Sequence, residues 1–89
     1  MANILVEEKG ADSYHVTVED KSTTTHTVTL DPAYYQKLTG GKASEAELIK
    51  RSFEFLLERE SNTMILSRFD LPLINRYFPE YERTISSSF

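Results

Sequence analysis

The fold is decided by residues 13–30, SYHVTVEDKSTTTHTVTL. Polar and apolar side chains alternate from residue 13 to 19 and again from 24 to 30, which is the period of a β-strand. The apolar row is formed, in chain order, by Tyr14, Val16, Val18, His26, Val28 and Leu30. β-Branched residues fill both segments, as strands prefer. The pattern predicts two antiparallel strands with one buried face and one polar, water-facing face.

The register of these two strands follows from their faces. Both apolar rows must face the same core, because a slip of one residue would turn one row outward. A three-residue loop, Lys21-Ser22-Thr23, satisfies this condition. It pairs Val18 with His26, Val16 with Val28 and Tyr14 with Leu30.

Working outward toward the N-terminus, the run Ile4-Leu5-Val6 predicts one more strand over residues 3–8. The turn signal Lys9–Asp12 separates it from the strand at 13–19. We therefore expect a three-stranded antiparallel meander over about 3–8, 13–19 and 24–30.

Helical signals begin directly after the meander. Asp31 is a good N-cap, and Pro32 is tolerated at the first helical position because the N–H that it lacks has no partner there. Gly40-Gly41 accepts the left-handed conformation that ends a helix. These signals predict a short helix over 32–39.

The best-defined helix begins after Ser44, which forms a capping box with Glu47. It is expected over 45–60. Its main apolar stripe consists of Ala46, Ile49, Phe53, Leu56 and Leu57. Leu48 and Phe55, seven residues apart, form a second stripe beside the first. The helix should therefore be covered by the sheet and, in addition, by either another helix or a partner chain, which makes Leu48 and Phe55 candidates for self-association.

The rest of the chain gives weaker signals. The pattern does not assign a conformation to residues 61–70. Asp70 is expected to cap another short helix over about 71–78, which Pro79 ends. The sequence thus predicts a single α+β domain, 1–85, in which the meander packs against the long helix, followed by a frayed tail, 86–89.

Composition narrows the class of protein. The chain has 89 residues, no cysteine and a formal net charge of −4. The first ten residues, MANILVEEKG, do not resemble a signal peptide, and no apolar run is long enough for a membrane span. We expect a cytoplasmic protein with no membrane partner. The acidic balance also disfavours nucleic acid, because binding to phosphates depends largely on Lys and Arg.

No set of residues predicts catalysis. The two histidines point to opposite faces of the meander, with His15 on the polar face and His26 on the core face, so they cannot share a ligand. Glu54 and Glu58 are accompanied by basic residues, as on a solvated helix face. Nucleophile-elbow, phosphate-loop and zinc-helix motifs are absent from the sequence. We predict no catalytic residues, no cofactor and no metal, and hence a protein that is not an enzyme.

Residues 25–59 resemble the ribbon-helix-helix repressors and antitoxins. The resemblance consists of a strand, a capped short helix, a glycine turn and the run Ser44-Glu45-Ala46-Glu47-Leu48-Ile49. It implies a strand paired between two subunits and placed in the major groove of DNA. It assigns base contacts to Thr25, Thr27 and Thr29 and a phosphate contact to the helix start at Ser44.

The C-terminal half is similar to a family of short uncharacterised bacterial proteins. The similarity is carried by SFEFLLERE (52–60) and RYFPEYE (76–82). It implies a bacterial domain and supplies no activity. The function that we predict is a small non-enzymatic interaction module that self-associates through the long helix as a homodimer. The partner that we expect is therefore protein, either a second copy or another chain. A ribbon-helix-helix-like DNA-binding protein is the alternative.

Overall fold

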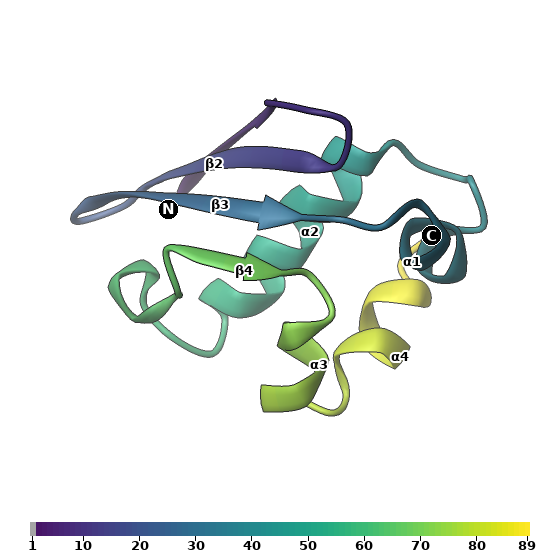
Figure 1. Cartoon of the computed structure of the whole chain (residues 1–89). Coiled ribbons are helices and arrows are strands. Elements are labelled where there is room, and N and C mark those ends of the chain that lie inside the picture. The colour runs from purple at the N-terminus through teal and green to yellow at the C-terminus, as the bar shows by residue number, and fades with distance from the viewer. Residues whose placement is uncertain (1) are drawn as a thin grey trace.

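The computed structural model describes residues 2–89; Met1, which belongs to the predicted domain 1–85, lies outside them. In chain order the elements are β1 (Asn3–Glu8), β2 (Ser13–Glu19), β3 (Thr23–Thr29), α1 (Pro32–Thr39), α2 (Glu45–Leu57), the 3-10 helix η1 (Asn62–Met64), β4 (Arg68–Asp70), α3 (Leu73–Tyr77) and α4 (Tyr81–Ser86) (Figure 1). The α+β class is confirmed.

The sheet has four strands in the order β1-β2-β3-β4. The first three form the expected antiparallel meander, with β3 beginning and ending one residue earlier than predicted. The prediction of a purely antiparallel, three-stranded sheet was wrong, because β4 pairs in parallel with β3 and occupies its second edge. A strand of three residues with one buried side chain, Phe69, is too short to show the alternation that identifies a strand.

The predicted register of β2 and β3 was wrong by two residues. Tyr14 lies opposite Val28, and Val16 lies opposite His26. The loop has three residues, as expected, but it is Asp20–Ser22, and the Asp20 N–H donates to the Ser22 carbonyl. A shift of two residues keeps every side chain on its predicted face, because side chains alternate with period two.

The two faces of the sheet differ as predicted. The core-facing row is almost completely buried, His26 included. The opposite face is half-buried or exposed along its length, and among its residues Leu5 is 54% exposed. Helix α2 packs across the core face, and the three other α-helices gather beyond the end of β3 (Figure 1).

Two of the three predicted helix starts, at Asp31 and Ser44, are confirmed. Asp31 accepts a hydrogen bond from the Ala33 N–H at the start of α1, and Ser44 accepts one from the Glu47 N–H at the start of α2. Gly40 ends α1 in the left-handed region, at φ 61°. Because its Cα carries no side chain, glycine adopts this conformation without strain.

Helix α2 ends at Leu57, three residues before the predicted end at 60. The Arg59 and Glu60 N–H groups both donate to the Leu56 carbonyl, so the chain tightens into a turn. The Arg59 side chain folds back, bonds the Phe55 carbonyl and stacks 3.6 Å from the centroid of the Phe55 ring. Along the main stripe, Ala46 is exposed and Leu57 is half-buried, so the buried stripe is narrower than expected.

The C-terminal segment departs most from prediction. Helix α3 spans 73–77 rather than 71–78, and Asp70 belongs to β4, where its carboxylate accepts a hydrogen bond from the Thr29 hydroxyl instead of capping a helix. Helix α4 was not expected. It includes the first residue of the predicted frayed tail, and Phe89 at the end of that tail packs against the core.

Candidate functional site

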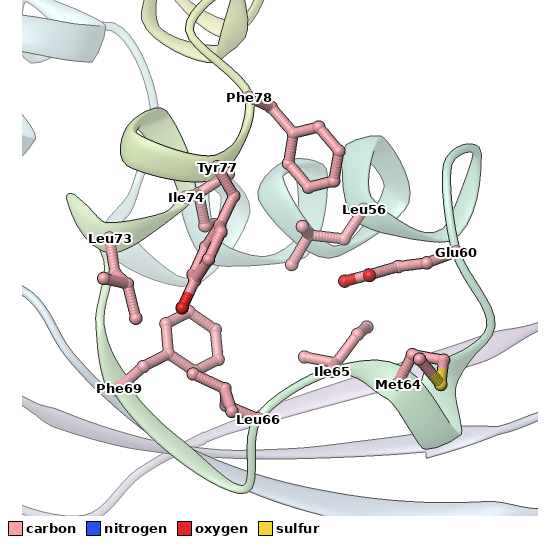
Figure 2. Close-up of a pocket in the computed structure, with 10 residues that line it drawn as sticks. All are labelled: Leu56, Glu60, Met64, Ile65, Leu66, Phe69, Leu73, Ile74, Tyr77 and Phe78. Atoms are coloured by element: carbon pink, nitrogen blue, oxygen red, sulfur yellow. The ribbon is translucent and has the colours of Figure 1, made fainter.

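A pocket of about 330 Å³ opens at the C-terminal end of α2 (Figure 2). Four segments form it: the end of α2 and the turn after it, the chain that follows η1, β4, and α3. The lining residues are Leu56, Glu60, Met64, Ile65, Leu66, Phe69, Leu73, Ile74, Tyr77 and Phe78. This volume lies near the lower end of the range of about 300–1,000 Å³ that is typical of ligand sites.

The wall formed by residues 62–66 is held in place by two buried polar side chains. The Asn62 side-chain amide donates to the Ser22 carbonyl over 2.9 Å and to the Thr24 hydroxyl over 3.0 Å. The His26 Nδ1 lies 2.7 Å from the Leu66 carbonyl. This segment, whose only regular element is the single turn η1, is thereby fixed to the β2–β3 hairpin, and the bonds satisfy buried polar groups on both sides.

The rim of the pocket is unusually apolar for an exposed surface. Met64 is 69% exposed, Leu66 49% and Tyr77 66%. These are three of the four large hydrophobic residues that the described part of the chain exposes, and the fourth is Leu5 on the sheet. Scattered apolar residues are normal on a surface, but apolar residues gathered around a cavity are typical of a binding site.

Glu60 is the one charged residue in the lining. Its carboxylate extends between Leu56 and Ile65 and lies across the pocket from Tyr77 (Figure 2). Within residues 2–89, Glu60 has no ion pair, because the neighbouring Arg59 is engaged by Glu58 and Glu80. The pocket therefore offers one uncompensated negative charge within an apolar lining.

Three aromatic rings also line the pocket, those of Phe69, Tyr77 and Phe78. The face of an aromatic ring carries partial negative charge and attracts cations. Apolar walls, ring faces and a single carboxylate are together suited to a group with an apolar stem and a positively charged end.

Sequence reasoning missed this site because most of its rim lies in the segment 61–70, which the pattern left unassigned. The signal available was the apolar run Met64-Ile65-Leu66, which lies outside any strand or helix of normal length. Such a run in a loop has no regular element to bury it. The structure buries Ile65 at 8% exposure and leaves its two neighbours open.

The residues predicted for self-association, Leu48 and Phe55, lie in the interior, with exposed fractions of 0% and 4%. The second covering element of α2 is another helix of the same chain. The Phe55 ring contacts the Tyr81 ring of α4 at a centroid distance of 5.3 Å. The Tyr81 hydroxyl lies 2.6 Å from the Ser52 hydroxyl, and burial raises the pKa of Tyr81 above its ordinary value. Neither predicted residue is accessible to a partner in this structure.

The residues of the DNA-binding alternative are not brought together into one site. Thr25, Thr27 and Thr29 lie on the sheet face that points away from the core, whereas Ser44 caps α2, which packs on the core face. Both edges of β3 are occupied within the chain, by β2 and β4. The strand therefore has no free edge for the pairing between subunits that the ribbon-helix-helix arrangement requires.

The two histidines lie on opposite faces of the sheet, as predicted. His26 is buried and its Nε2 lies 2.9 Å from the Thr24 hydroxyl. Among residues 2–89 there is no group of three or more His, Cys, Asp or Glu side chains placed to hold a metal ion. The same residues include no helix that is long and apolar enough to span a membrane.

Comparison of the chain with family models, with curated proteins and with solved structures gave no match. The resemblances to ribbon-helix-helix proteins and to short bacterial proteins stay predictions. The functional argument therefore depends on the geometry of the pocket.

Proposed function

We propose that this protein is a non-enzymatic interaction module whose pocket holds a basic side chain, Arg or Lys, of a partner protein. The observation that carries the proposal is the uncompensated Glu60 carboxylate set in an otherwise apolar, aromatic pocket. An Arg or Lys side chain would lay its methylene stem along Leu56, Ile65 and Phe69 and bring its charge to Glu60.

The chemistry of the lining supports binding rather than catalysis. It contains one carboxylate and one phenol, and no histidine, serine, threonine or cysteine. General acid–base or nucleophilic catalysis needs a second reacting group within hydrogen-bond reach of the first. The exposed rim, Met64, Leu66 and Tyr77, supplies the apolar contact area that surrounds an anchoring side chain in a protein interface.

The charge of the molecule supports a basic partner. The chain carries a formal net charge of −4, so a basic segment would approach it favourably at low ionic strength. A site built around one anchor and a small apolar rim should bind weakly, with a dissociation constant on the order of 0.1–1 mM for an isolated peptide.

The test is a titration monitored by NMR amide shifts, with two short peptides that differ in one side chain. The first contains a central Leu-Arg-Leu, and the second replaces Arg with citrulline, which has nearly the same shape and no charge. The Arg peptide should shift the signals of Met64, Leu66 and Tyr77, and the citrulline peptide should bind roughly tenfold more weakly. Equal binding of both peptides, or shifts confined to other surfaces, would refute the proposal.

Two variants sharpen this test. Glu60→Gln should remove the preference for Arg over citrulline, because it removes the charge and keeps the size of the side chain. Glu54→Gln is the matched control, because Glu54 is an exposed carboxylate on α2 that does not line the pocket. It should bind both peptides as the unaltered protein does.

A further inference from the structure

The outer edge of β1 is unpaired within residues 2–89, since β1 is the terminal strand of the sheet and β2 occupies its other edge. It runs for six residues without a proline or a bulge in its pairing. Exposed edges of this kind pair readily with another strand unless something blocks them. This edge therefore offers an interaction surface that is separate from the pocket.

The hydrogen bonds of the sheet identify the backbone groups that are free on this edge. The Lys9 N–H donates to the Ser13 carbonyl, so in this antiparallel pair the odd-numbered residues of β1 bond to β2. The even-numbered residues, Ile4, Val6 and Glu8, direct their N–H and C=O groups outward. They form a continuous row of donors and acceptors along the edge.

Side chains on the two faces of β1 favour an apolar partner strand. Ile4 and Val6 are half-buried on the helix side and pack against the core. Leu5 is on the other face and is 54% exposed. The two carboxylates of the strand, Glu7 and Glu8, are confined to its C-terminal end.

We propose that a second copy of this chain binds here, with the two β1 strands paired antiparallel about a two-fold axis at Leu5. In this register Leu5 lies opposite Leu5 of the second copy, and Ile4 lies opposite Val6. The acidic end of each strand faces the uncharged start of the other, with Glu7 opposite Asn3. Any shift toward the C-terminus brings the glutamates of the two copies closer together, so charge disfavours every such shift.

The helix side of this edge carries charges of both signs. A second hollow, of about 350 Å³, lies beside the start of β1, and Lys50, Glu54 and Glu58 of α2 line it together with Ala2 and Ile4. In the proposed register Glu8 of the second copy lies opposite Ala2 and points to this side, where Lys50 is the one cation of the lining. Within the described residues neither Glu8 nor Lys50 has an ion-pair partner. Symmetry forms the Glu8–Lys50 contact twice, and the result is a continuous eight-stranded sheet.

The proposal does not depend on what the pocket binds, because the pocket and this edge share no residue. The experiment is sedimentation of the full chain over a concentration series that reaches about 1 mM. The unaltered protein should dimerise. A monomer throughout the series would overturn the proposal and leave the function of the pocket untouched.

Leu5→Lys places two positive charges directly opposite each other at the centre of the interface and should weaken the dimer by roughly thirtyfold or more. Thr25→Lys is the matched control, because Thr25 is exposed on the same face and in the same cross-strand row, two strands away from the edge. It should leave the dissociation constant unchanged. Equal effects of the two variants would overturn the proposed edge.

A charge exchange tests the register without changing apolar contacts. Lys50→Glu should weaken the dimer by several-fold, because it leaves Glu8 of the second copy facing only carboxylates in this hollow. Adding Glu8→Lys to Lys50→Glu should restore the dimer, because the contact regains opposite charges. No recovery in the double variant would overturn the register. Far-UV circular dichroism of each variant confirms that its fold is unchanged.

Discussion

Two neighbouring residues of α2, Phe55 and Leu56, face two regions of the molecule that differ in how far they are covered by other elements. Phe55 lies under α4, in a region whose central residue, Tyr81, is completely buried. Leu56 lines the pocket, where Met64 and Tyr77 are more than half exposed. Both regions are rich in aromatic and aliphatic side chains, yet one is core and the other is surface.

The difference lies in polar contacts that fasten one element to the next. Helix α4 is held by the Tyr81–Ser52 contact, by Tyr34 and Lys37 of α1 on Glu82, and by the Asn75 side chain on the Glu82 N–H. In the described chain no hydrogen bond joins α3 to residues 61–66 across the pocket. Apolar composition alone therefore does not distinguish a core from a binding surface. The distinction depends on whether another element of the chain is held in place over the apolar residues.

The largest expected effect comes from truncating the tyrosine of each region in turn. Tyr81→Ala should lower the free energy of unfolding by about 3–5 kcal/mol, because it leaves a large cavity and removes the hydroxyl that contacts Ser52. Tyr77→Ala should change it by less than about 0.5 kcal/mol, because Tyr77 is 66% exposed. Urea unfolding of both variants provides the measurement. Similar losses in the two variants would show that the pocket is part of the core.

The next effect concerns the anchor of the pocket wall. Asn62→Ala should lower the free energy of unfolding by about 1–3 kcal/mol, because it removes the donor to the Ser22 carbonyl and the Thr24 hydroxyl. Thr63→Ala is the adjacent control, because Thr63 is exposed and bonds only within its own turn. Thr63→Ala should change the free energy of unfolding by close to zero in the same urea unfolding assay. If the two variants were equal, the wall would not depend on Asn62.

The smallest effect appears only at high pH. Burial raises the pKa of Tyr81 above the value of 10.0 that the unfolded chain has, so the folded state holds this proton more tightly. The contribution of Tyr81 to the free energy of unfolding is then fully present below pH 10. Above pH 10 the free energy of unfolding falls by about 1.4 kcal/mol per pH unit for one tyrosine. Denaturation at several pH values from about 9 to 11 measures this slope. Tyr81→Phe should reduce the slope, and an unchanged slope would assign it to other groups.

The features that sequence predicted well were local. The apolar run Ile4–Val6 and the alternation in 13–19 predicted two strands with their observed bounds, and Asp31 and Ser44 predicted the starts of α1 and α2. Such features depend on periodicity and capping within a few residues, and these patterns can be recognised in the sequence alone. The sequence also predicted which side chains of β3 face the core, although it did not predict the register of β3 with β2. The observed register differs by two residues, and only a shift by an odd number of residues would turn the side chains to the other face.

The features that sequence missed depend on distant parts of the chain. β4 is a strand only because it pairs with β3, some forty residues earlier, and α4 forms against α1 and α2. Leu48 and Phe55 were identified as a second apolar stripe, but the stripe alone could not show that α4 covers it. The pocket was missed for the same reason, since its rim is apolar sequence that no element of the chain covers.

The parallel pairing of β4 with β3 has a consequence for the order of assembly. The meander and α1 can form from contacts close in sequence, whereas β4 can pair only after the chain has passed along α2 and returned. Closing so large a loop costs conformational entropy before any contact repays it, so this step is expected to come late in folding. A strand of three residues at a sheet edge is also the first to open. Transient release of β4 would carry Phe69 away and widen the pocket, while His26 and Asn62 keep residues 62–66 on the intact meander, so that the mouth of the pocket can adjust to a ligand without global unfolding.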